Sequence, residues 1–169
     1  MELIYPNEKY LKSYEEAFNE QKRLCPNEGG MCPPSLILET AYKFRNGINI
    51  PKGLLPRTIL WLIDNDEFIG FVDIRHGLDD ILMNRGGHIG YLIKYTKRRQ
   101  GYGYKQFELA LEYIKKTFNF DKLLVTCDDD NIPSIKIIER YGGKLSDKIE
   151  NILDDGKKII TRRYWINLL

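Results

Sequence analysis

The hydrophobic period of the chain changes repeatedly between residues 57 and 127, and this order restricts the fold more than any other feature. The runs "RTILWLI" and "EFIGFVDIR" are rich in β-branched and aromatic residues, and the intervening "DND" predicts a hairpin. "HIGYLI" predicts a third strand. The stretch "KYTKRRQGYGYKQFELALEYIKK" then shows the i, i+3, i+4, i+7 apolar spacing of a helix, and "KLLVTC" predicts a short buried strand.

The flanking segments extend this pattern to the whole chain. "ELIY" predicts a first strand and two helical patterns follow it, while "NIPSIKIIERYGG" predicts a helix before a final hairpin. The strand–helix–strand unit from His88 to Cys127 predicts a right-handed parallel crossover. We therefore expect an α/β (α+β) fold: a single domain over residues 1–169, with a mixed, mostly antiparallel sheet of about seven strands, a central parallel β-α-β crossover and helices on both faces.

Composition excludes several classes of protein. The net charge is only +2, from 26 basic and 24 acidic residues, which argues against a general nucleic-acid binder. No apolar run approaches the roughly 20 residues that span a bilayer, so we expect no membrane segment. The three cysteines have no metal-binding spacing, so no metal is expected. Their odd number, and an N-terminus unlike a secretion signal, favour the cytoplasm.

The turn "RRQGYGYK" directly precedes the start of the amphipathic helix. The first amides of a helix have no intrahelical partner and lie at the positive end of its dipole, so they bind anions readily. Gly101 and Gly103 permit a close approach, and cations surround them. These cations are Lys94, Lys97, Arg98, Arg99 and Lys105. The combination predicts a pyrophosphate site rather than a plain charged turn.

Two other phosphate-binding motifs fit less well. The chain has no G-x-x-x-x-G-K-[ST], which excludes a P-loop. The dinucleotide motif G-x-G-x-x-G requires a third glycine, and Gln106 occupies that place. Asp128, after the next strand, has the position of the acid that binds ribose in such proteins. A dinucleotide-binding oxidoreductase domain therefore stays as an alternative, although the flanking hairpins disfavour it.

These segments resemble the GCN5-related N-acetyltransferase (GNAT) superfamily, whose acyl-CoA signature is [Q/R]-x-x-G-x-[G/A]. Arg98, Gly101 and Gly103 match it, and the resemblance is clearest over residues 58–145, the expected coenzyme-binding core. It implies the acyl-CoA N-acyltransferase fold and acetyl-CoA as co-substrate. It also implies that the strand ending at Leu92 and Ile93 splays from the strand ending at Cys127, leaving room for the pantetheine arm.

The resemblance implies roles for particular residues. The main chain of the turn would bind the pyrophosphate, and an N–H near Ile93 would polarise the thioester carbonyl. Asn131 and Ser134 match positions that line the coenzyme's arm, although a plain helix cap explains Asn131 equally well. The expected cofactor-binding residues are Leu92, Ile93, Arg98, Arg99, Gln100, Gly101, Tyr102, Gly103, Tyr104, Asn131 and Ser134.

The candidate catalytic residues depart from the family's usual pattern. Many relatives have a glutamate where this chain has His88, so His88 is the first candidate for the base, with Asp73 and His76 as the others. An aspartate inside a strand needs a partner, and a salt bridge with Arg75, Arg162 or Arg163 is its alternative role. In many relatives a tyrosine protonates the leaving thiolate, and Ile138 occupies its position here. Tyr141, three residues further on, is the candidate for this role.

We therefore predict an acetyl-CoA-dependent N-acetyltransferase that acts on a primary amine by direct transfer in a ternary complex. A non-catalytic acyl-CoA-binding module is the alternative, because of Ile138. The expected partner is an amine-bearing acceptor, either a small molecule or a peptide, and the expected state is a monomer or homodimer. The segment "CPNEGGMCPPS" is among those expected to face the acceptor.

Overall fold

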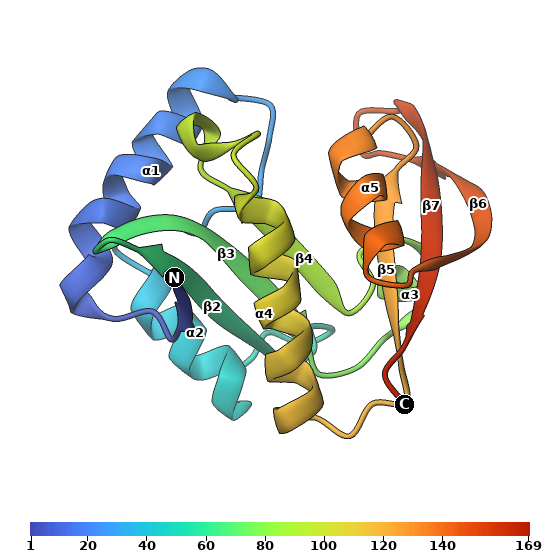
Figure 1. Ribbon diagram of the computed structural model, residues 1–169, viewed down its shortest axis with the longest axis horizontal. Coiled ribbons are helices and arrows are strands. Elements are labelled where there is room, and N and C mark those ends of the chain that lie inside the picture. Colours follow the sequence, from blue (N-terminus) through green and yellow to red (C-terminus); the bar gives the residue numbers. More distant parts are fainter. The chain divides into compact units, whose positions relative to one another are not determined.

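The computed structural model describes all of residues 1–169 and divides the chain into two compact units. Unit 1 comprises Met1–Ile74 and Tyr91–Ala110, and unit 2 comprises Arg75–Gly90 and Leu111–Leu169. Figure 1 follows the chain through both, from blue at the N-terminus to red at the C-terminus.

Unit 1 contains a four-stranded sheet in the order β1-β2-β3-β4. Its strands are β1 (Glu2–Ile4), β2 (Arg57–Asp64), β3 (Glu67–Arg75) and β4 (Ile89–Ile93), of which the last residue of β3 and the first two of β4 belong to unit 2. β1 pairs antiparallel with β2, and the "DND" turn between β2 and β3 has Asn65 and Asp66 in the left-handed region. The hairpin predicted from "DND" is confirmed.

The helices of unit 1 are the 3-10 turns η1 (Glu8–Tyr10) and η2 (Tyr95–Lys97), α1 (Leu11–Leu24), α2 (Ile37–Asn46), and the first part of α4 (Tyr102–Thr117). Of these, α1 packs on the sheet through an aromatic cluster. Tyr14 of α1 stacks on Trp61 of β2 with ring centroids 4.7 Å apart, and Phe68 meets both rings edge-on. Alternate residues of β2 face this cluster, as strand geometry requires.

Unit 2 contains a second, antiparallel sheet in the order β5-β7-β6. Its elements are α3 (Asp80–Asn84), the end of α4, β5 (Lys122–Asp128), α5 (Ile132–Arg140), β6 (Lys144–Ile152) and β7 (Lys158–Asn167). Tyr164 of β7 is fully buried, and its hydroxyl group donates to Glu139 of α5 at 3.1 Å.

The predicted mixed α/β fold with about seven strands is confirmed, including both hairpins and every long helix. The hydrogen bonding adds a detail: β4 and β5, the expected parallel neighbours, belong to different sheets and share no ladder. No helix is both long enough and apolar enough to cross a bilayer.

Candidate functional site

The segment between β4 and α4 has the backbone of a tight turn. Arg98 is extended, Arg99 is left-handed with φ 63°, and Gly101 is left-handed with φ 86°. A non-glycine residue in the left-handed region is strained, and such residues concentrate at functional sites. A Cβ atom added to Gly101 would meet no atom within 4 Å, so the space beside this glycine is open.

The amides at the start of α4 are left without protein partners. Gly101 C=O accepts from Tyr104 N–H at 3.1 Å and from Lys105 N–H at 3.3 Å. The five preceding amides, those of residues 99–103, donate to no acceptor in the protein. Arg99, Gln100 and Gly101 are exposed, and the first amides of a helix have no intrahelical partner. This stretch of amides is therefore available to an external anion, whereas the Tyr104 amide is already used.

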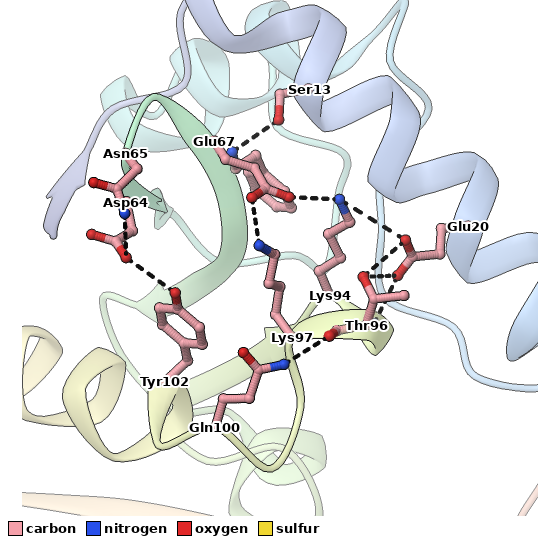
Figure 2. A network of polar contacts seen from close by, with 11 residues as sticks. Ser13, Glu20, Asp64, Asn65, Glu67, Lys94, Thr96, Lys97, Gln100 and Tyr102 are labelled. Atoms are coloured by element: carbon pink, nitrogen blue, oxygen red, sulfur yellow. Dashed lines mark hydrogen bonds and ion pairs between the residues drawn. The ribbon is translucent and has the colours of Figure 1, made fainter.

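The cations of this segment mostly pair with carboxylates of the protein, as Figure 2 shows for two of them. Lys94 Nζ lies 2.9 Å from one oxygen of Glu67, and Lys97 Nζ lies 2.6 Å from the other. Burial acts to raise the pKa of Glu67, but the hydrogen bonds from Lys97 and Lys94 leave it lowered. Glu20 of α1 accepts from both the amide and the hydroxyl group of Thr96.

Arg98 also bonds within the protein. Its guanidinium forms two bonds to the Glu28 carboxylate, at 3.1 and 2.6 Å, and its Nε donates to Ile93 C=O at 3.1 Å. The bond from Arg98 lowers the pKa of Glu28. Lys105 pairs with Glu108 at 2.6 Å. Arg99 is thus the one predicted phosphate-site cation without a carboxylate partner.

Sequence reasoning missed the carboxylates that hold this turn. Glu20, Glu28 and Glu67 lie on α1, on the segment after it and on β3. No local signal marks them, because each pairs with a residue at least 27 positions away. Their effect is to fix the turn in place, which lowers the ordering cost of binding a ligand there.

β4 is an edge strand, so one side of its backbone has no neighbouring strand in its sheet. Lys94 N–H donates to Ile69 C=O of β3, and β4 is the last strand of its sheet. Because hydrogen-bonding directions alternate along a strand, the Ile93 N–H points away from β3. Leu92 C=O instead accepts from Gln106 Nε2 at 3.4 Å. Gln106 itself is fully buried, so the third-glycine place of a dinucleotide motif is filled by a core side chain.

The start of α5 in unit 2 is capped by its own sequence. The Asn131 side-chain oxygen accepts from the Ser134 amide at 3.2 Å, which is the N-cap geometry. Asn131 is exposed and Ser134 is half-buried.

His88, the first candidate for the base, bonds to β5. Its Nδ1 accepts from the Leu124 amide at 2.9 Å, while its own amide donates to Leu124 C=O at 2.8 Å. Burial lowers the pKa of this imidazole, so the neutral form dominates. A neutral imidazole that accepts at Nδ1 carries its proton on Nε2. His88 therefore has no free lone pair for an amine proton in this arrangement.

Two further catalytic candidates, Asp73 and Tyr141, lie in different units. Asp73 of β3 is buried and pairs with Arg57 of β2 at 3.2 Å, a partner that the sequence analysis did not name. Tyr141 is half-buried and ends α5. Ile138, in the family's tyrosine position, is fully buried.

A cavity of about 80 Å³ adjoins Asp73 within unit 1. Residues of α1, α2, β2, β3 and the segment over residues 25–35 line it. They include Tyr14, Cys32, Thr40, Arg57, Trp61 and Asp73. A second, more open hollow of about 520 Å³ is also lined by the segment over residues 25–35. The sequence predicts that this segment faces the acceptor, and it borders both hollows.

The predicted residues thus fall into two groups. Unit 1 brings together the amides of the turn, the Ile93 edge and the Asp73 cavity, while His88, Asn131, Ser134 and Tyr141 belong to unit 2. The positive φ of Gly101 gives the turn that the sequence predicts. The cation cluster differs from the expectation, because four of its five members pair with carboxylates of the protein.

Comparison with known proteins agrees with these features. A family model described as "Acetyltransferase (GNAT) domain" matches residues 17–144, which is most of the chain. The chain therefore belongs to the GNAT acetyltransferase family. No curated protein matches it.

Solved structures of acetyltransferases share the fold at low sequence identity. RimL, a ribosomal L7/L12 alpha-N-protein acetyltransferase in complex with coenzyme A, is similar with a TM-score of 0.71 and 12% identity, covering 98% of this chain and 92% of that chain. yncA from Salmonella typhimurium, a putative acetyltransferase with acetyl-CoA, has a TM-score of 0.70 and 12% identity, over 99% and 93%. A spermidine N-acetyltransferase SpeG chimera from Vibrio cholerae and hSSAT has a TM-score of 0.68 and 16% identity, over 99% and 96%.

Proposed function

We propose that the protein is an acetyl-CoA-dependent N-acetyltransferase that transfers an acetyl group directly to a primary amine. The observation that carries the proposal is the run of five amides at residues 99–103 without protein acceptors, at the start of a long helix. Such amides favour a diphosphate. Family membership and the coenzyme in related structures support the same co-substrate.

The coenzyme-binding residues follow from this placement. The main chain from Arg99 to Gly103 binds the diphosphate, and the exposed Arg99 guanidinium adds charge. Arg98 acts by holding the turn rather than by contacting phosphate, because Glu28 and Ile93 already use its donors. Asn131 contributes through its side-chain NH2, since its oxygen caps α5. Residues 58–145 form the coenzyme-binding core, within a single catalytic domain over residues 1–169.

The chemistry needs little more than positioning and polarisation. The amine nitrogen attacks the thioester carbonyl, the C–N bond forms, the C–S bond breaks and the thiolate leaves. The Ile93 N–H stabilises the charge that develops on the carbonyl oxygen. A base removes the proton of the amine. Asp73 is its candidate in the observed arrangement, and His88 becomes a candidate only when the bond from the Leu124 amide to its Nδ1 breaks. Tyr141 is the candidate that protonates the thiolate.

The occupied Nδ1 of His88 makes a sharp test of the base. If His88 is the base, His88→Gln loses turnover and keeps coenzyme affinity. If it only holds Leu124, His88→Asn, whose side-chain oxygen can replace Nδ1, keeps turnover. Asp73→Asn and Tyr141→Phe are compared with the His88 variants in the same thiol-release assay. A variant that loses turnover but keeps coenzyme affinity identifies a catalytic group.

Calorimetric titration tests coenzyme binding directly. Acetyl-CoA should bind in the micromolar range, inorganic pyrophosphate should compete with it, and reduced nicotinamide dinucleotide should not bind. Binding of the nicotinamide dinucleotide in place of acetyl-CoA would contradict the proposal.

Incubation with acetyl-CoA and a panel of amines, with release of free thiol as the signal, tests transfer. RimL and SpeG carry names that describe a protein α-amine and spermidine as acceptors, so both kinds of amine belong in the panel. Tight coenzyme binding without thiol release would favour the non-catalytic binding module, which the buried Ile138 in the family's tyrosine position keeps open. We further propose that the protein works in the cytoplasm, in line with its three free cysteines, as a monomer or homodimer.

A further inference from the structure

Arg98, the first residue of the acyl-CoA signature, uses every nitrogen of its guanidinium group within unit 1. Its Nη1 and Nη2 atoms donate to the two oxygens of the Glu28 carboxylate at 3.1 and 2.6 Å, and its Nε donates to Ile93 C=O at 3.1 Å. Two parallel bonds between a guanidinium and a carboxylate are stronger and more directional than a single neutral hydrogen bond. Arg98 therefore connects Glu28 to Ile93 through one planar, rigid group.

Glu28 is also tied to helix α1. The Gln21 side chain of α1 is only 5% exposed, and its Nε2 donates to both the main-chain oxygen and the carboxylate of Glu28 at 3.3 Å. The Glu28 amide donates to Cys25 C=O at 2.9 Å. These bonds fix the position of Glu28 within the segment over residues 25–35, so the segment is connected to Arg98 by a side chain that is itself held in place.

The peptide group between Ile93 and Lys94 is held at both of its polar atoms. Its C=O accepts from Arg98 Nε, and its N–H, that of Lys94, donates to Ile69 C=O at 2.8 Å. Because a peptide group is planar, only the φ and ψ angles of Ile93 separate this plane from the preceding one, which carries the Ile93 N–H. The bond from Arg98 therefore helps to fix the direction of the N–H that polarises the thioester in the proposed mechanism.

The exposure of the ion pair decides which property of the protein it affects. The Glu28 and Arg98 side chains are 51% and 30% exposed, and ion pairs this open to solvent contribute little to global stability. The bond from Arg98 lowers the pKa of Glu28, so the carboxylate stays charged at neutral pH. A small displacement of a group beside the reacting atoms can cost about a hundredfold in rate. Loss of the pair should therefore affect transfer far more than folding.

We propose that Glu28 is a positioning residue for acetyl transfer: through Arg98 it holds the Ile93 peptide in the direction that polarises the thioester. Because the segment over residues 25–35 borders both hollows of unit 1, the same contact links the wall of those hollows to the Ile93 N–H. The inference rests on the proposed acetyltransferase function and adds to it a residue that the family signature does not contain.

The carbonyl carbon of Ile93 reports the bond from Arg98 without coenzyme or turnover. The chain has three Ile-Lys dipeptides, so a sample with ¹³C-carbonyl isoleucine and ¹⁵N-lysine gives three correlated signals. They belong to Ile93–Lys94, Ile114–Lys115 and Ile135–Lys136. Because a hydrogen bond deshields a carbonyl carbon, Glu28→Gln and Arg98→Gln should both shift the Ile93 signal upfield and leave the other two signals, which come from α4 and α5, in place.

The thiol-release assay tests the effect on transfer. Glu28→Gln keeps the shape of the side chain but turns one acceptor oxygen into an NH2 group, which cannot accept from the guanidinium. We expect kcat to fall about tenfold. The Kd for acetyl-CoA should rise about threefold or less, because Glu20 and Glu67 continue to hold the turn. The urea midpoint should shift by less than about 0.5 M.

Glu108→Gln is the matched control for this variant. Glu108 pairs with Lys105 at the same 2.6 Å and is comparably exposed, but the pair lies within α4. This variant should leave kcat and the Ile93 carbonyl signal unchanged.

A charge swap separates positioning from simple ion pairing. The double variant Glu28→Arg/Arg98→Glu restores opposite charges, but the side chain introduced at position 98 has no N–H to donate to Ile93 C=O. The value of kcat should therefore stay as low as in Arg98→Gln, and the Ile93 carbonyl signal should stay upfield. Recovery of kcat in the swapped protein would show that opposite charges alone suffice and would overturn the inference.

The outcomes also distinguish this inference from the proposed function. If Glu28→Gln keeps kcat, or lowers it only in step with a lowered urea midpoint, the inference is overturned and the proposed function stands. If the unchanged protein releases no thiol, the proposed function is overturned and the Ile93 signal alone decides the connection. An upfield shift in Glu28→Gln then supports the connection from Glu28 to Ile93, and an unmoved signal overturns it.

Discussion

The helices α4 and α5 both begin at turns that the sequence predicts to bind coenzyme, but the amides of the two turns have different partners. At the start of α4, the five amides of residues 99–103 have no acceptor in the protein. At the start of α5, the Asn131 side chain accepts from the Ser134 amide. A helix start that satisfies its own amides has fewer donors left for a ligand.

The Leu124 amide of the edge strand β5 provides a further comparison. The Leu124 amide of β5 bonds to the His88 imidazole, so a side chain again satisfies a main-chain donor. Main-chain amides of this protein therefore fall into two groups. Side chains accept from the amides of Ser134 and Leu124, whereas no side chain accepts from the amide of Gly101. Only the open set has the character of an anion-binding site.

The largest effect is expected for Gly101→Ala. A Cβ forces a residue with φ 86° into a strained conformation and enters the open space beside the free amides. We expect the Kd for acetyl-CoA to rise about tenfold, which corresponds to ~1.4 kcal/mol. Gly142→Ala is the matched control, because Gly142 also has φ 86° and an open Cβ position but follows the end of α5.

Both glycine variants should lose about 1–2 kcal/mol of unfolding free energy in urea, and only Gly101→Ala should lose affinity in calorimetry. Equal affinity in the two variants would show that the α4 start is no more a binding site than the α5 end.

A smaller effect is expected at Asn131. Asn131→Ala removes the cap and should cost about 1 kcal/mol of stability. Asn131→Ser keeps a capping oxygen and should restore stability, but it lacks the NH2 group, so the Kd for acetyl-CoA should stay about fivefold raised. Full recovery of affinity in the serine variant would reduce Asn131 to a cap alone. Urea unfolding and calorimetry on the same samples give both quantities.

A further effect, about threefold on Kd, is expected for Arg99→Gln at low ionic strength. Arg99 is exposed and has no carboxylate partner, whereas Lys105 pairs with Glu108 at 2.6 Å. Exposed charges contribute less than about 1 kcal/mol and are screened by salt, so the effect should shrink at 0.5 M salt. Lys105→Gln is the control and should change affinity less. A loss of affinity that does not depend on salt would contradict an electrostatic role for Arg99.

The smallest effect concerns the capped strand edge and appears as a pH dependence. Burial lowers the pKa of His88 from its ordinary value of 6.5, so below that pH the unfolded chain binds a proton that the folded protein resists. Stability should therefore fall, by about 0.5 kcal/mol between pH 7.5 and 5.5. His88→Asn cannot titrate and should show a smaller fall in urea unfolding. The carboxylates with lowered pKa, such as Glu28, titrate at lower pH and do not interfere.

Most of the fold is readable from the sequence because its signals are local. The period of apolar residues predicts the strands and helices, and Asn131 and Pro133 mark the start of α5 as observed. The division of the seven strands into two hydrogen-bonded sheets is not readable, because it depends on which strands pair and not on which segments are strands.

The candidate site is readable only in its backbone. Gly101 requires a positive φ and the sequence places a glycine there, so the turn follows. The ion pair between Asp73 and Arg57 is different: Arg57 lies on the neighbouring strand β2, 16 positions away in the sequence. The register between two strands chooses that partner, and no spacing along the chain encodes it.

By itself, the sequence determined the order of the elements, the glycine turn before α4 and the family signature at Arg98, Gly101 and Gly103. The tertiary structure alone decided that Glu20, Glu28 and Glu67 pair with cations of the turn, and that the His88 imidazole accepts from the Leu124 amide of β5. The physical reason is range. Backbone preferences act over a few residues, whereas hydrogen bonds and ion pairs depend on side chains that folding brings together from distant segments.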